Sequence, residues 1–228
     1  MLNELELTGR ARTHVVQRDD LGAALHAAAL EAFLAMRHAA AGEGIDIAIA
    51  SAFRDFAAQQ RIWDMKYRGE RPLYDPEGRP RDHAALDEAE LVDAILCWSA
   101  LPGASRHHWG TEIDVYDRAA MTGGYRLRLL PEEYAEGGVF ERLRRWLDDN
   151  MRAYGFYRPY DTYRGGVLPE PWHLSYAEVS SPAISALTLD VLERTVRDST
   201  LLGKGHVLAR LPDIHRRYVT TVDAPPAV

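Results

Sequence analysis

Residues 105–116 read Ser-Arg-His-His-Trp-Gly-Thr-Glu-Ile-Asp-Val-Tyr, and this stretch decides the fold that we predict from the sequence. From residue 111 onward, apolar and polar residues alternate, which is the pattern of a half-buried β-strand. Ile113 and Val115 are therefore expected to face a core, and Asp114 the opposite side of the sheet. Gly110 allows the chain to turn before the strand, so that His107 reaches the same cleft as Asp114. A neutral imidazole and a carboxylate suit a Zn²⁺ ion.

A second polar segment, Glu170-Pro171-Trp172-His173, opens another predicted strand over residues 172–179. Alternation places Trp172 and Leu174 in the core and turns His173 away from it. Two histidines and one carboxylate leave a fourth tetrahedral position for water, as in catalytic zinc sites. Glu170 lies three residues before His173, on the loop that enters the strand. It is expected to stand close to the metal without binding it, as a general base.

A third segment, Ser-Ala-Phe-Arg-Asp-Phe-Ala-Ala-Gln at residues 51–59, lies where a predicted strand meets a predicted helix. The planar guanidinium of Arg54 suits a carboxylate. Gln59 follows five residues later and offers an amide donor. Taken alone, Arg54 is more often part of a surface salt bridge, and a single His–Asp pair is weak evidence for a metal site. The functional interpretation therefore rests on the joint occurrence of the three segments.

The remaining sequence predicts a mixture of helices and strands without a regular βαβ rhythm, which favours an α+β fold with an antiparallel sheet over a doubly wound fold. The expected elements are a helix that Asp19 or Asp20 caps and Gly42 or Gly44 ends, a strand over 45–50, helices over 55–67, 84–98 and 139–154, a short strand at 156–157, and one or two helices within 187–218. We expect a single domain, 1–228, with a motif-bearing core of about 45–180 and a helical extension of about 185–220.

Composition excludes several classes of protein. The chain has 228 residues, 46% hydrophobic and 27% charged, as in soluble globular proteins. A net charge of -7 gives no electrostatic footprint for nucleic acid or an anionic membrane. The single cysteine, Cys97, excludes an intrachain disulfide framework. We expect no membrane insertion. The acidic N-terminus favours a cytoplasmic location, or a periplasmic or extracellular one if a signal has been removed or a partner exports the chain.

The motif Ser-x-His-(x)₆-Asp at 105–114, followed by Glu-x-Trp-His at 170–173, resembles the zinc D-alanyl-D-alanine carboxypeptidases and dipeptidases of peptidoglycan metabolism, a family related to the zinc domain of hedgehog proteins. The segment 51–59 is similar to the family's arginine-bearing segment, and the resemblance covers about residues 47–176. It implies an α+β fold with a small central antiparallel sheet and flanking helices, one Zn²⁺ per chain, and a peptidoglycan peptide as substrate. It also implies these roles: His107, Asp114 and His173 as metal ligands, Glu170 as catalytic base, and Arg54, Gln59 and Ser105 as substrate-binding residues.

The resemblance implies a D,D-carboxypeptidase that hydrolyses the terminal D-Ala-D-Ala bond. An endopeptidase of the same family is the enzymatic alternative. A binding module with a structural zinc ion is a third interpretation, which the presence of Glu170 argues against. An aromatic substrate-site residue is left open between Tyr157 and Tyr160, and Glu112 is expected either to support the metal ligands or to be solvated. His108 is ambiguous, and ordinary structural roles are expected for His14, His26, His38, His83, His206 and His215.

Overall fold

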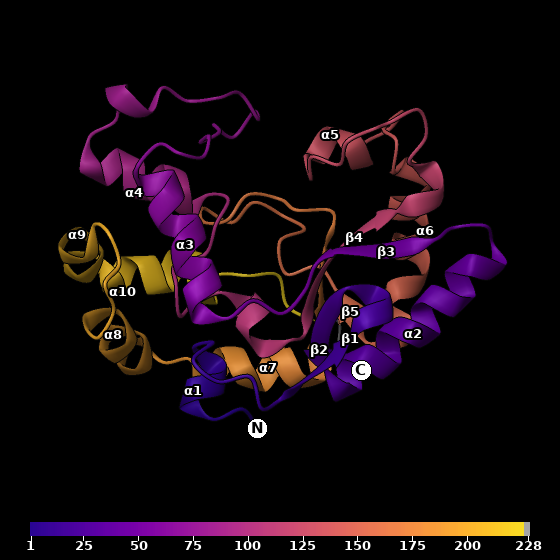
Figure 1. Ribbon diagram of the computed structural model, residues 1–228, viewed down its shortest axis with the longest axis horizontal. Helices are drawn as coiled ribbons and strands as arrows, with labels where there is room; N and C mark the ends of the chain where they lie inside the picture. Colours follow the sequence, from indigo (N-terminus) through magenta and orange to yellow (C-terminus); the bar gives the residue numbers. More distant parts are fainter. Residues whose placement is uncertain (226–228) are drawn as a thin grey trace.

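A four-stranded antiparallel sheet lies at the centre of the computed structural model, which describes residues 1–225 (Figure 1). The strand order is β3 (Ile47–Ser51), β4 (Glu112–Asp117), β6 (His173–Tyr176) and β5 (Phe156–Tyr157). Every neighbouring pair is antiparallel. The predicted α+β class with a small antiparallel sheet is confirmed. Residues 226–228 of the predicted domain lie outside the described residues.

One face of this sheet builds a hydrophobic core. Ile113 and Val115 of β4 and Leu174 of β6 are fully buried there, because alternate residues of a strand point to the same side. The core is completed by α2 (Ala27–Gly42) and α6 (Glu141–Asn150). The opposite face of the same strands is therefore left for polar side chains.

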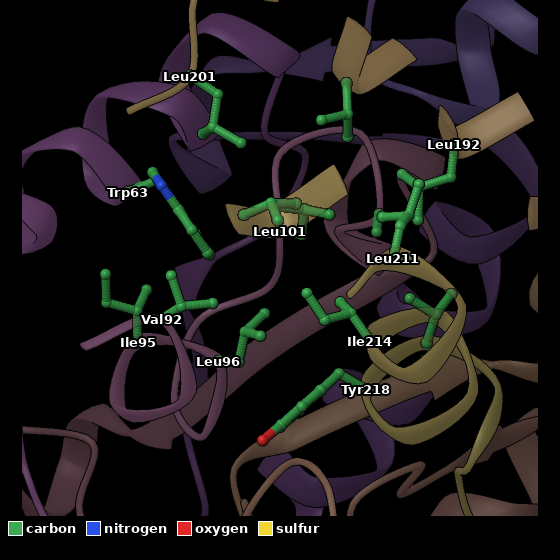
Figure 2. Close-up of a cluster of buried hydrophobic side chains, with 14 of the residues drawn as sticks. Trp63, Val92, Ile95, Leu96, Leu101, Leu192, Leu201, Leu211, Ile214 and Tyr218 are labelled. Carbon is green, nitrogen blue, oxygen red and sulfur yellow. The ribbon is translucent and has the colours of Figure 1, made fainter. Parts of the chain in front are cut away.

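A second cluster of buried apolar side chains joins α3 (Phe56–Tyr67) and α4 (Glu88–Leu96) to the C-terminal helices. Figure 2 shows Trp63 and Ile95 from the first pair facing Leu211 and Tyr218 from the C-terminal part. The predicted helices within 187–218 are present as α8 (Leu189–Arg197), α9 (Lys204–Ala209), α10 (Leu211–Ile214) and a π-helical turn (His215–Thr220). Their apolar side chains belong to the same buried cluster as Trp63 of α3.

The remaining elements are short. They are α1 (Glu4–Leu7), the hairpin strands β1 (Val15–Arg18) and β2 (Ala23–His26), α5 (Pro131–Tyr134), α7 (Ala177–Ala186) and single turns of 3-10 helix. None of the helices among residues 1–225 is both long enough and apolar enough to cross a membrane.

The N-terminal helix begins later than the sequence predicts. Residues 23–26 form β2, which pairs with β1 in antiparallel register. Gly22 adopts a left-handed conformation, φ 62°, at the turn before β2. Helix α2 starts only at Ala27, where the His26 side chain accepts a hydrogen bond from the Ala28 amide, and it ends at Gly42 as expected. The small apolar residues of this segment also satisfy helical spacing, so the sequence pattern did not reveal this local hairpin.

Three other boundaries also differ from the prediction. The strand predicted over 172–179 spans only 173–176, because the Ala177 amide bonds to Gly155 and the chain continues as α7. The helix predicted over 84–98 is α4, which starts at Glu88 because Asp87 and Glu90 form a capping box. The helix predicted over 139–154 is α6 followed by a 3-10 turn, Met151–Tyr154.

Candidate metal centre and catalytic cleft

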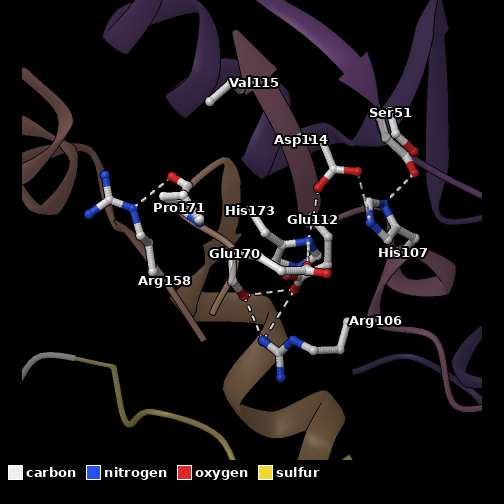
Figure 3. A network of polar contacts seen from close by, with 12 residues as sticks. Ser51, Arg106, His107, Glu112, Asp114, Val115, Arg158, Glu170, Pro171 and His173 are labelled. Carbon is white, nitrogen blue, oxygen red and sulfur yellow. Dashed lines mark hydrogen bonds and ion pairs between the residues drawn. The ribbon is translucent and has the colours of Figure 1, made fainter. Parts of the chain in front are cut away.

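The register between β4 and β6 places Asp114 directly opposite His173 on the polar face of the sheet. His107 joins them from the 3-10 turn Arg106–Trp109 that precedes β4. All three residues are buried, and one ligand atom from each lies within 4.8 Å of the others. Figure 3 shows the three side chains turned toward one another. The structure thus brings together the three residues that the sequence analysis selected as metal ligands.

The turn between His107 and β4 requires a glycine. Gly110 has φ 68°, and a Cβ atom there would lie 2.4 Å from Val15 Cγ1 and 2.8 Å from the His26 amide nitrogen. The His26 amide also donates to the Gly110 carbonyl at 2.8 Å. The N-terminal hairpin therefore packs directly on the turn that carries His107.

Hydrogen bonds on the far side of each imidazole determine which nitrogen faces the site. His107 Nδ1 is 2.7 Å from the Ala52 carbonyl oxygen, which can only accept, so Nδ1 carries the proton and Nε2 faces Asp114 Oδ2 at 3.5 Å. His173 Nε2 lies 2.8 Å from Glu112 Oε2, and its Nδ1 lies 3.0 Å from Asp114 Oδ1. Two oriented imidazoles and a carboxylate are a donor set that fits Zn²⁺.

The two imidazoles differ in charge when no metal is bound. Burial lowers the pKa of His107 to about 3, so this ring is neutral. Burial also disfavours the charged form of His173, but hydrogen bonds to Asp114 and Glu112 outweigh it and raise the pKa to about 10. A bound metal ion would take the place of the Nδ1 proton of His173, since ligating imidazoles are deprotonated at the binding nitrogen.

Glu112 is fully buried behind His173, so the expectation that it supports the ligands holds and the solvated alternative does not. Its carboxylate lies 3.2 Å from the Arg106 guanidinium and accepts a 2.7 Å hydrogen bond from the Ser175 hydroxyl. Burial alone would raise the pKa of Glu112. The charge of Arg106 and the hydrogen bonds from His173 and Ser175 instead lower it to about 2. Sequence reasoning missed Arg106, because its role depends on Glu112. Only the β4–β6 register places this second carboxylate beside His173.

Glu170 stands beside the three-residue group without being part of it. Its Oε2 lies 3.6 Å from His173 Nδ1, and its side chain is 13% exposed. Burial is the largest cause that raises the pKa of this carboxyl, to about 7. Of the two open tyrosines, Tyr160 lines the cleft, with its ring centroid 5.1 Å from that of His173. Tyr157 instead accepts a hydrogen bond from Arg106 at 3.0 Å, behind the site.

Arg54 lies at the edge of the same cleft, between β3 and α3. Its guanidinium donates to Gln59 Oε1 at 2.6 Å and to Ser51 Oγ at 2.9 Å. Gln59 is fully buried, and its amide nitrogen donates to the Ala100 carbonyl at 2.7 Å. Both ends of the Gln59 amide are therefore bonded within the protein, and Gln59 holds the Arg54 guanidinium; that Gln59 also binds substrate stays a prediction. Ser105 is buried and does line the cleft.

Backbone hydrogen bonds tie the arginine segment to the metal loop. The Arg54 amide donates to the His107 carbonyl at 3.1 Å, and His108 Nδ1 donates to the Arg54 carbonyl at 2.6 Å. The other nitrogen of His108 accepts from the Gly103 amide at 3.1 Å. His108 therefore has a structural role. Among the described residues, the group of three potential ligands does not include it or His14, His26, His38, His83, His206 and His215.

The cleft has a volume of about 340 Å³, within the range of small-ligand sites. The three potential ligands, Glu170 and Arg54 all line it. Four further cations line it that the sequence analysis did not single out: Lys66, Arg71, Arg106 and Arg128. Of these, only Arg106 lies within one of the three segments, so no motif could have indicated the other three.

The profile of the VanY family, described as D-alanyl-D-alanine carboxypeptidase, matches residues 22–179 of this chain. An uncharacterized protein of Haemophilus influenzae is 32% identical over 127 residues, which are 55% of this chain and 95% of that protein. A D-alanyl-D-alanine carboxypeptidase of Enterococcus faecalis is 32% identical over 147 residues, 63% of this chain but only 44% of that protein.

Solved structures share the fold. VanYB in complex with D-alanine-D-alanine matches with a TM-score of 0.51 and 22% identity, over 83% of this chain and 92% of that one. The LdcB LD-carboxypeptidase matches with a TM-score of 0.54 and 21% identity, over 80% and 76%. The sequence match covers well over half of the chain, and the folds agree. This chain therefore belongs to the VanY family of D-alanyl-D-alanine carboxypeptidases.

Proposed function

We propose that the protein is a zinc-dependent D,D-carboxypeptidase that removes the C-terminal D-alanine from peptidoglycan peptides ending in D-Ala-D-Ala. The observation that carries this proposal is the convergence of His107, Asp114 and His173 with Glu170 beside them in one cleft. Related structures support the choice of metal and substrate. One is a VanY variant in complex with Zn(II), and another is VanYB with D-alanine-D-alanine.

Zinc bound by these three residues would polarise the scissile carbonyl and lower the pKa of a coordinated water. The oriented nitrogens of His107 and His173 and the Asp114 carboxylate are the groups that would hold the ion. Glu170 accepts the proton of the attacking water and passes it to the leaving amine. Tyr160 and Trp172 line the cleft around these groups and help to exclude bulk water.

Arg54 favours cleavage at a chain end over cleavage within a chain. Gln59 and Ser51 hold its guanidinium through neutral oxygen atoms, so no carboxylate of the protein neutralises it in these contacts. A free C-terminal carboxylate matches such a group, whereas the peptide amide that an endopeptidase meets would leave the charge uncompensated. Ser105 is placed in the cleft to add a hydroxyl donor.

The deciding experiment uses purified, zinc-loaded protein and two peptides that differ at one group. One peptide ends in D-Ala-D-Ala as the free acid, and the other is its C-terminal amide. Mass spectrometry of the products identifies the cleaved bond. We expect release of D-alanine and a preference for the acid of roughly tenfold to a hundredfold, the size of one charge-assisted hydrogen bond. Arg54→Ala should lose most of that preference.

Equal cleavage of the acid and the amide by the wild type would favour the endopeptidase. Zinc binding without cleavage of either peptide would favour the non-catalytic binding module.

A further inference from the structure

The cleft holds more positive charge than the proposed reaction uses. The chain has a net charge of -7, yet five cationic side chains line this one cavity: Arg54, Lys66, Arg71, Arg106 and Arg128. Among residues 1–225, only two carboxylates line it, Asp114 and Glu170. Asp114 is a potential metal ligand, and a zinc ion would add further positive charge.

Two of the five cations are neutralised by the protein itself. Arg106 pairs with the buried Glu112 at 3.2 Å, and Arg128 lies 3.5 Å from Glu132. Within residues 1–225, by contrast, no carboxylate lies within 4.0 Å of the charged groups of the other three, Arg54, Lys66 and Arg71. Arg71 is exposed to solvent, whereas Arg54 and Lys66 are each partly buried, so these two are the cations that an anion entering the cleft would stabilise most.

Helix α3 places Lys66 on the same side of the cleft as Arg54. Lys66 Nζ donates to the Ser99 hydroxyl at 2.6 Å. Two turns earlier on α3, Gln59 donates to the carbonyl of the adjacent Ala100 and accepts from Arg54. The segment 99–100 thus orients both the lysine and the partner of the arginine.

The protein uses only part of the hydrogen-bonding capacity of the Lys66 ammonium. An ammonium has three N–H donors, and Ser99 accepts one of them. Burial is the largest influence on Lys66 and lowers its pKa to about 8, although the nearby charge of Glu170 acts in the opposite direction. A partly buried cation without a counter-ion is stabilised when an anion binds to it.

We propose that Lys66 is a specificity residue that binds a carboxylate of the leaving C-terminal residue, together with Arg54. This inference rests on the proposed function and adds the chemistry of the leaving residue to it. The carboxylate has two possible sources. It is either the α-carboxylate, which the two cations would share, or a second carboxylate on an acidic side chain of the leaving residue.

Two peptides distinguish these sources, one ending in D-Ala-D-Ala and one ending in D-Ala-D-Glu. Lys66→Met should lower kcat/KM by about tenfold or more, mainly through KM, because a charge-assisted hydrogen bond is lost. Lys66→Arg keeps the charge and should restore much of the activity. An equal loss on both peptides assigns Lys66 to the α-carboxylate. Loss of a wild-type preference for D-Glu assigns it to the side chain. Unchanged kcat/KM on both peptides would overturn the proposal.

The sequence supplies a matched control and a direct probe of binding. Only two of the 27 basic residues are lysines, Lys66 and Lys204. Lys204 donates to the carbonyls of Arg197 and Ser199, away from the cleft, so Lys204→Met should leave kcat/KM unchanged. Reductive methylation with ¹³C labels just these two side chains and the N-terminal amine. Adding D-alanine or D-glutamate to the zinc-loaded protein should move the Lys66 resonance and not that of Lys204.

The two readouts separate failure of this inference from failure of the proposed function. If the wild type cleaves the peptides but the Lys66 resonance and the kinetics of Lys66→Met are unchanged, only the inference fails. If the wild type cleaves neither peptide, the proposed reaction fails. A shifted Lys66 resonance would then still support carboxylate binding at this site.

Discussion

Single side chains in this cleft are expected to have separable roles, and metal content distinguishes the proposed base from the proposed ligands. Glu170 lies beside the group formed by His107, Asp114 and His173. Glu170→Gln should therefore keep one zinc ion per chain while turnover falls by roughly 10²–10⁴, the usual loss when a general base is removed. His173→Ala should lose zinc as well as activity. Elemental analysis beside the peptide assay checks both, and zinc loss in Glu170→Gln would contradict the assignment of Glu170.

Glu112 provides a second prediction at the scale of one residue. Its carboxylate accepts from His173 Nε2 and so turns Nδ1 toward the site. Glu112→Gln should weaken zinc affinity by about tenfold or more, since groups that orient ligands typically contribute 10–100-fold. Chelator competition measures the affinity, and ¹⁵N NMR of His173 should find the proton on Nε2 in the wild type.

Ser175→Ala is the matched control for Glu112→Gln. Ser175 donates to the same carboxylate, whereas the hydrogen bonds of the His173 ring go to Asp114 and Glu112. It should change zinc affinity much less than Glu112→Gln does. Equal effects of the two variants would mean that Glu112 acts only by stabilising the buried network.

The elements around the site depend on one another through the turn at Gly110. Gly110→Ala puts a methyl group against Val15 and the His26 backbone and also strains a left-handed residue. Gly123 has a similar φ of 63° but nothing within 4 Å of an added Cβ. We expect Gly123→Ala to cost roughly 1 kcal/mol of stability and Gly110→Ala at least about 2 kcal/mol more, with weaker zinc binding. Urea unfolding and zinc titration compare the two variants, and equal losses would contradict this packing argument.

The sequence predicted those elements whose burial pattern is local. Alternation identified β4, and the helix predicted over 55–67 is α3 within one residue of its observed bounds. The hairpin strand β2 was missed because its alanine-rich segment also satisfies a helical pattern, although its partner strand is the neighbouring segment 15–18. The alternation that begins at Trp172 suggested a strand that runs too far, since the start of α7 depends on a bond to Gly155. Register was equally invisible, so the position of Glu112 beside His173 could not be derived.

At the scale of the whole molecule, the site joins two hydrophobic clusters. The sheet that carries Asp114 and His173 rests on one, and α3, which carries Lys66, rests on the other through Trp63. In Figure 1, α3, α4 and α8–α10 gather on one side of the view, and α2 and α6 on the other. The motif residues could be predicted because their types and spacing indicate zinc chemistry. Lys66 could not, because its place in the cleft depends on how these two clusters pack.

The charge of Lys66 should also lower the stability of the whole metal-free protein. Its pKa falls from 10.5 to about 8 on folding, mainly through burial. The folded state therefore binds the proton less tightly than the unfolded chain, and the penalty is complete below pH 8. As pH rises from 8 to 10.5, the folded protein loses this proton first, so the penalty disappears. Each pKa unit corresponds to about 1.4 kcal/mol, which partial exposure reduces to an expected total of about 1–3 kcal/mol.

Lys66→Met should thus raise the free energy of unfolding at pH 7, and its advantage over the wild type should shrink toward pH 10. Urea unfolding of the metal-free proteins across this range measures the difference, with Lys204→Met as the control that should show no such trend. A constant difference between Lys66→Met and the wild type from pH 7 to pH 10 would mean that the lysine carries no electrostatic penalty. Under the proposal, Lys66 lowers the stability of the free protein because its charge is held ready for a substrate carboxylate. The stability penalty and the substrate selectivity should therefore both be lost in Lys66→Met.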